Sequence, residues 1–150
     1  MPDYIEKLHH ARQEGKDKLK ALADFVDKRL PKLIDAISKI AEDTACPASL
    51  AVRRFNNNNK GYGDVSVEVY KPCTQWQRII GSAHDELCGV VRVQWGITDC
   101  PNTSSVTIGK HFQIGLHSDN SDLHKSDEEI LRPIQQFFQE TAINYVKTHP

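Results

Sequence analysis

The sequence lacks the motifs that identify most enzymes and cofactor-binding proteins. It contains no Gly-x-x-x-x-Gly-Lys phosphate loop, no Gly-x-Ser-x-Gly nucleophile elbow, no His-Glu-x-x-His zinc motif and no Rossmann fingerprint. Its four cysteines form no Cys-x-x-Cys pair, which is the spacing of zinc ribbons and dithiol redox sites. Whether the chain is an enzyme therefore stays open, with no recognisable catalytic residue and no cofactor to expect.

Long apolar runs and an excess of one charge are missing as well. No run approaches the roughly 18–20 apolar residues of a membrane span, and the first residues contain no apolar signal-peptide segment. The formal net charge is −1, which disfavours nucleic-acid binding through bulk positive charge. We expect a cytoplasmic protein that binds neither a membrane nor nucleic acid.

The sequence does have the length and composition of one globular domain. Its 150 residues, 39% of them hydrophobic, are enough to bury a core without disulfide or metal staples. The sequence pattern divides this predicted single domain, 1–150, into a helical segment 3–44, a sheet region 50–117 and a C-terminal helix 127–147.

The first segment has helical spacing but is too long for a compact domain. From Leu19 to Ile40, seven apolar residues recur in six steps over 21 positions, a mean spacing of 3.5. A straight helix over 3–44 would be about 60 Å long, whereas a domain of this size is only about 40 Å across. The helix therefore either breaks, with Pro31 the expected place, or projects at its polar N-terminal end and meets another subunit.

The middle of the chain alternates between apolar and polar residues, as a half-buried strand does. Strands 50–55 and 64–70 flank a loop rich in Asn and Gly, which predicts a hairpin. Strands 89–97 and 105–117 flank a second turn signal that contains Pro and Asn, which predicts another. Residues 74–86 fit either a short helix or a fifth strand.

Ser126 and Glu129 form a capping-box pattern that starts the last helix. The element order places helices before, within and after a set of alternating strands. The predicted fold class is therefore α+β in two layers. We expect a four- or five-stranded antiparallel sheet, with the N-terminal helical segment and the C-terminal helix packed on one face.

The polar face of the predicted sheet carries the main candidates for a binding site. Alternation places five side chains on this outward face: Tyr70, Arg92, Gln94, His111 and Gln113. Arg92 suits a carboxylate or phosphate, while Tyr70 and His111 supply aromatic contact. An ordinary solvated face explains the same residues, so both interpretations stay open.

A weaker candidate precedes the last helix. His117, Asp119, Asp122 and His124 place four potential metal ligands within eight residues, and two imidazoles with a carboxylate suit zinc. Short polar residues before a helix are also typical of turns and caps, which is the simpler explanation. We therefore expect no bound metal.

Two functional hypotheses from different classes follow. The first is a non-catalytic protein-interaction or assembly module, a homodimer that also contacts another protein. The over-long helix and the missing catalytic motifs support it. The alternative is a small-molecule-binding domain or small enzyme, which would use the polar sheet face or a pocket between the sheet and the helices.

Overall fold

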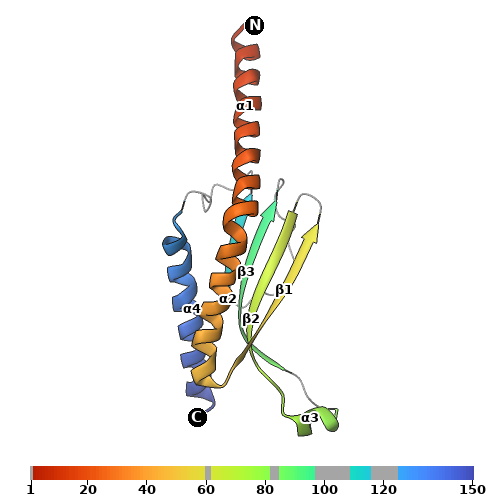
Figure 1. Cartoon of the computed structure of the whole chain (residues 1–150), viewed down its shortest axis with the longest axis vertical. Coiled ribbons are helices and arrows are strands. Elements are labelled where there is room, and N and C mark those ends of the chain that lie inside the picture. The colour runs from red at the N-terminus through yellow and green to blue at the C-terminus, as the bar shows by residue number, and fades with distance from the viewer. Residues whose placement is uncertain (1, 60–61, 82–84, 97–108, 116–124) are drawn as a thin grey trace.

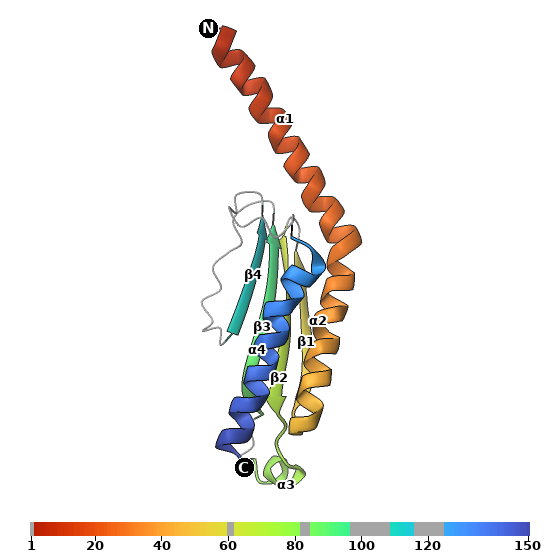
Figure 2. The ribbon, with the colours of Figure 1, turned by 90° about the vertical axis from the view of Figure 1, so that its left-hand side faces the viewer.

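The computed structural model describes residues 2–59, 62–81, 85–96, 109–115 and 125–150. Its elements in chain order are α1 (Pro2–Asp24), a π-helical turn (Phe25–Arg29), α2 (Leu30–Ala45), a 3-10 turn (Cys46–Ala48), β1 (Ala51–Asn59), β2 (Tyr62–Lys71), α3 (Gln75–Ile79), β3 (Glu86–Gly96), β4 (Gly109–Gly115) and α4 (Asp127–Thr148). Helices α2 and α4 lie side by side over one face of a four-stranded sheet (Figures 1 and 2). The predicted α+β class, with helices packed on one face, is confirmed.

The sheet is mixed rather than purely antiparallel. Its strand order is β1-β2-β3-β4, in which the first two pairs are antiparallel but β3 and β4 run parallel. The predicted antiparallel pairing of the last two strands is therefore wrong. Alternation shows which residues face the core, but the pattern is the same for either strand direction. The connection 97–108, outside the described residues, has the dozen or so residues that a parallel crossover needs.

Helix α3 lies within residues 74–86, the segment whose sequence fits either a short helix or a fifth strand. The N–H of Ile80 donates to the carbonyl of Trp76 at 3.1 Å, which closes this short helix. The described part of the chain therefore forms four strands, and the fifth strand that the sequence left open is absent from it.

The core lies between the sheet and the helices α2 and α4. Val65, Val67 and Val69 of β2 alternate toward these helices, as the sequence predicts. The largest fully buried side chains are Phe138, Ile37, Ile134, Val67 and Val91. At the margin of this layer, Arg54 of β1 donates to Asp35 of α2 at 3.0 Å, which ties the edge strand to its covering helix.

The N-terminal helical segment continues through α1 into α2 and changes its geometry just before Pro31. Proline has no N–H for the carbonyl of Asp27, and its ring crowds that turn. The hydrogen-bond ladder widens there into a π turn, in which the N–H of Leu30 donates to the carbonyl of Phe25. Instead of a break at Pro31, the structure has a bend, and α1 projects beyond the sheet (Figure 2).

Candidate functional site

The predicted binding face is less open than alternation suggests. Register pairs Arg92 with His111, and Gln94 with Gln113, across β3 and β4. Only the backbone of the two β4 residues is described. Arg92 Nε donates to Ser66 Oγ at 3.3 Å, and both Ser66 (9% exposed) and Gln94 (4%) are buried. The structure describes the side chains of Tyr70, Arg92 and Gln94 from the predicted site. Of these, Gln94 is buried and therefore does not face solvent.

Tyr70, the fifth predicted residue, lies away from the other four. It is four residues along β2 from Ser66, the partner of Arg92, and four strand residues span about 13 Å. The guanidinium of Arg53 covers the Tyr70 ring, 4.4 Å from its centroid. Arg53 also pairs with Glu68 at 3.2 Å and Asp85 at 3.3 Å. Two carboxylates balance the Arg53 charge, so this cluster stabilises the end of the sheet and does not attract an anion.

The Arg53 cluster also holds the connection that carries α3. Asp85 Oδ1 accepts the backbone N–H of Cys73 at 3.1 Å, while its other oxygen accepts from Arg53. One carboxylate therefore links the chain before α3, the chain after α3 and the edge strand β1. Sequence reasoning missed this cluster. The only local signal was the position of Arg53 opposite Glu68 in the predicted hairpin.

The described residues contain one thiol with a shifted pKa, at Cys88, and no candidate metal cluster. Burial raises the pKa of the Cys88 thiol, with a smaller contribution from Glu86, so the thiol is protonated near neutral pH and is a poor nucleophile. Within the described ranges, His, Cys, Asp and Glu side chains form no group of three or more that could hold a metal ion. The four weak metal candidates lie outside these ranges: His117, Asp119, Asp122 and His124.

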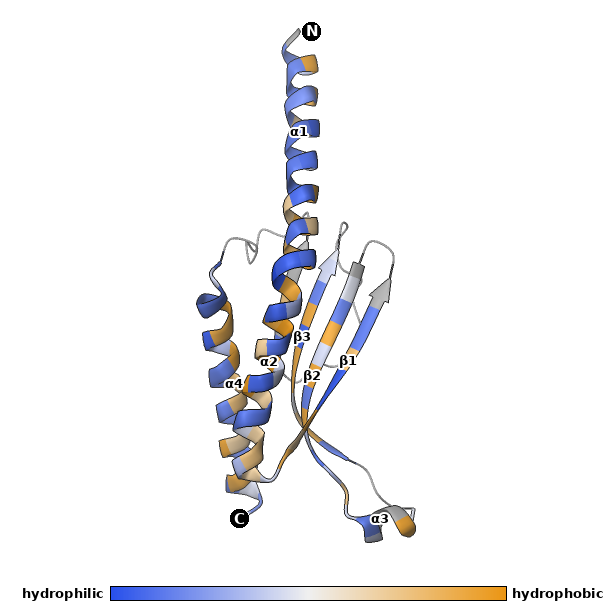
Figure 3. Ribbon diagram, in the orientation of Figure 1, coloured by the Kyte–Doolittle hydropathy of each residue, from blue (hydrophilic) through white to orange (hydrophobic). Residues whose placement is uncertain are grey.

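Residues 2–21 of α1 form a projecting arm. The residues from Asp3 to Ala21 are exposed, apart from the half-buried Gly15, and Leu22 is the first buried residue. The arm is mostly hydrophilic (Figure 3), yet it carries four exposed apolar side chains: Tyr4, Ile5, Leu8 and Leu19. Their spacing places three of them, Ile5 excepted, on the side of the helix that continues into Leu22. The arm therefore carries an interrupted apolar stripe in line with Leu22, with Tyr4 and Leu8 near its start, Leu19 near the core and no large apolar side chain between them.

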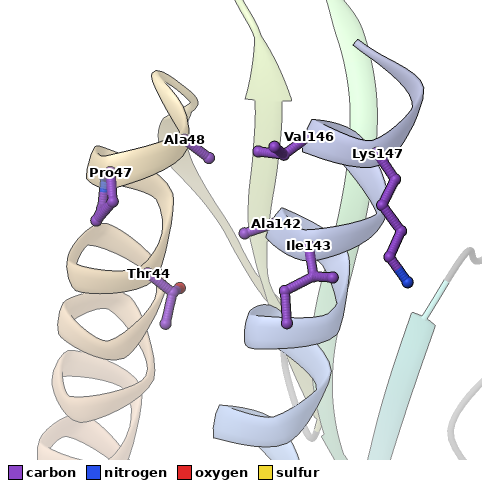
Figure 4. A pocket seen from close by; sticks show the side chains of 7 residues that line it. All are labelled: Thr44, Pro47, Ala48, Ala142, Ile143, Val146 and Lys147. Atoms are coloured by element: carbon purple, nitrogen blue, oxygen red, sulfur yellow. The ribbon is translucent and has the colours of Figure 1, made fainter. Parts of the chain in front are cut away.

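An apolar groove lies at the opposite end of the molecule, between the C-terminal ends of α2 and α4 (Figure 4). This end groove has a volume of about 320 Å³ and is lined by Thr44, Pro47, Ala48, Ala142, Ile143, Val146 and Lys147. The Thr44 hydroxyl donates to the Ile40 and Ala41 carbonyls, so its hydrogen-bonding capacity is used within the helix. The Lys147 ammonium points away from α2 (Figure 4). The interior of the end groove is therefore apolar.

Comparison with known proteins adds no functional information. No protein-family model, no curated protein and no solved structure matches the chain. None of the helices within the described ranges is both long and apolar enough to cross a bilayer. Any functional conclusion therefore depends on the surfaces of the molecule itself.

Proposed function

We propose that this protein is a non-catalytic interaction and assembly module that forms a homodimer through its projecting arm. The observation that carries the proposal is the row of exposed apolar side chains on the arm, beyond the reach of the core that buries the same stripe at Leu22. Most helical stability in proteins comes from packing of an apolar face, so packing against a second helix would stabilise the arm. A second arm offers the same stripe by symmetry.

The apolar area on the arm suits a weak dimer. Tyr4, Leu8 and Leu19 are 38–60% exposed. Fully burying one such side chain contributes roughly 1.5–3 kcal/mol, so covering the exposed half of all three contributes roughly 2–4.5 kcal/mol per arm. Two arms together contribute roughly 4–9 kcal/mol, which matches the lower part of an association cost of roughly 4–15 kcal/mol. We expect a dimer that depends on protein concentration.

The alternative, a small-molecule-binding domain or small enzyme, has less support. Tyr70 is covered by Arg53, whose charge is balanced by two carboxylates, and Gln94 is buried. Arg92 remains half-buried beside Ser66. Tyr70 also lies away from Arg92 along β2, whereas Tyr4, Leu8 and Leu19 share one side of the arm.

Light scattering behind a sizing column tests the proposal. We expect a mass of at least about 34 kDa, twice the 17.0 kDa of the chain. Leu8→Lys introduces a charge into the stripe and should reduce the mean mass about two-fold at the same concentration. His10→Lys, on the opposite side of the arm, is the matched control and should leave the mass unchanged. A 17.0 kDa wild-type particle, or equal masses for both variants, would refute the arm contact.

A further inference from the structure

We infer that the end groove of one chain receives the apolar tip of α3 from a second copy, so that dimers also join end to end. The tip consists of Trp76, Ile79 and Ile80. This contact is independent of the arm, since it lies at the other end of the molecule (Figure 1). It adds a second self-interaction to the proposed function.

The tip presents large apolar side chains to solvent. Trp76 is 68% exposed, Ile79 is 70% exposed and Ile80 is 54% exposed. The hydrogen bond from Ile80 to Trp76 closes one helical turn, and residues three or four apart share a side of such a turn. The Arg53 cluster fixes both ends of the connection, through Asp85 and the N–H of Cys73. The tip is therefore anchored to the sheet.

The tip and the end groove lie at the same end of the molecule. Both views place α3 at the same end of the molecule as the C-terminal ends of α2 and α4, opposite the N-terminus (Figures 1 and 2). A two-fold axis across this end sets each tip against the groove of the other chain, so one symmetric contact covers both apolar surfaces twice. Symmetric contacts of this kind are the commonest in homo-oligomers.

The two surfaces also match in chemistry. The centre of the end groove is uncharged, as the core of a protein interface usually is, and tryptophan is a frequent anchor in such pockets. Five side chains would be covered in each chain: Trp76, Ile79, Ile80, Ile143 and Val146. At about 100 Å² each they bury about 500 Å² per chain and about 1,000 Å² per pair, the lower limit for a specific interface. We therefore expect a weak, concentration-dependent contact.

Two symmetric contacts at opposite ends of one chain have a geometric consequence. The arm contact joins two chains, and when the arms pair antiparallel each dimer presents a free tip and end groove at both of its ends. Association through these ends then joins dimers into larger assemblies. The mean mass should rise above about 34 kDa as the concentration increases.

Cysteine cross-linking tests the contact directly. Single-cysteine chains are prepared in a background in which all four native cysteines are serine, and two such chains are mixed and mildly oxidised. Ile79→Cys mixed with Ile143→Cys should give a disulfide between chains. The control replaces Ile143→Cys by Asn144→Cys, the next residue on α4, which is exposed but does not line the groove. We expect at least a ten-fold higher yield for the first mixture.

Each outcome decides between the contacts. A high yield for the first mixture, with a mass that rises with concentration, supports the tip-to-groove contact. A yield equal to the control overturns it, and a stable mass of about 34 kDa then leaves the arm dimer intact. A preferred disulfide between Leu8→Cys and Ile143→Cys also overturns it, because the arm and not the tip would then occupy the groove.

A second measurement covers the case in which the cysteine-free chain does not fold. A photoreactive benzoylphenylalanine replaces Ile79 in the chain with its native cysteines, and the cross-linked peptide is identified by mass spectrometry. Cross-links to residues 142–147 of the partner support the contact. Cross-links only elsewhere, or only within one chain, overturn it.

Discussion

Gly109, the first residue of β4, is the position where an added methyl group meets the closest contacts among the four glycines whose surroundings are described: Gly15, Gly81, Gly89 and Gly109. Its φ is +135°, and an added Cβ would collide with the Val90 carbonyl and lie 2.6 Å from Phe137 Cζ. Backbone strain of this kind costs about 1–3 kcal/mol, and overpacking adds about 1–3 kcal/mol. We therefore expect Gly109→Ala to lower the free energy of unfolding by about 2–6 kcal/mol, a large share of the roughly 5–15 kcal/mol typical of a domain.

Two other glycines provide matched controls for the same substitution. At Gly89, which has no positive φ, the new Cβ would lie 3.0 Å from the Thr141 side chain, so Gly89→Ala should cost about 1–2 kcal/mol. At Gly15 nothing lies within 4 Å, and alanine should stabilise the helix by about 0.5–1 kcal/mol. Urea denaturation followed by far-UV circular dichroism measures all three. If Gly109→Ala cost less than Gly89→Ala, the placement of β4 against α4 would be wrong.

Two further predictions concern the sheet end and its neighbouring thiol. Arg53→Met removes the ion pairs to Glu68 and Asp85 and should lower the free energy of unfolding by about 1–2 kcal/mol, because partly exposed pairs contribute up to about 1 kcal/mol each. Unchanged urea stability would contradict that role. Because burial raises the pKa of Cys88, its alkylation near neutral pH should be slower than that of exposed Cys46; equal rates would argue against the shift. The unfolded chain releases the Cys88 proton first, so stability should fall as the pH rises above about 8.5.

The parts of the fold that depend on local signals were predictable from the sequence. The capping box is one example, since Ser126 Oγ accepts the N–H of Glu129 at 3.2 Å in the structure. Helix α4 then runs over Asp127–Thr148, one residue beyond the predicted end. Such signals involve residues within one turn of each other, so a single sequence contains them in full.

The parts that depend on distant residues were not predictable. Alternation in β3 and β4 identifies the core face but not the relative direction of the strands, which the crossover decides. The burial of Gln94 and the pairing of Asp85 with Arg53 also depend on tertiary placement. The end groove depends on the spacing between α2 and α4, which no sequence pattern specifies. The projecting arm was foreseen as one of two alternatives, the other being a break at Pro31. Both followed from comparing the length of the helix with the size of the domain.

The π turn before Pro31 sets the side toward which the apolar residues of the arm face. It accommodates one residue more than a regular helical turn does, and it brings Leu22 into phase with Leu30 on the core side. Deleting one residue from this turn would let a regular α-helix close with Leu22 still in phase, so Tyr4 and Leu8 would keep their direction. Closing the turn into a regular α-helix at unchanged length would instead rotate everything upstream by about 100°. The extra residue of the π turn is therefore what aligns the apolar side of the arm with the core.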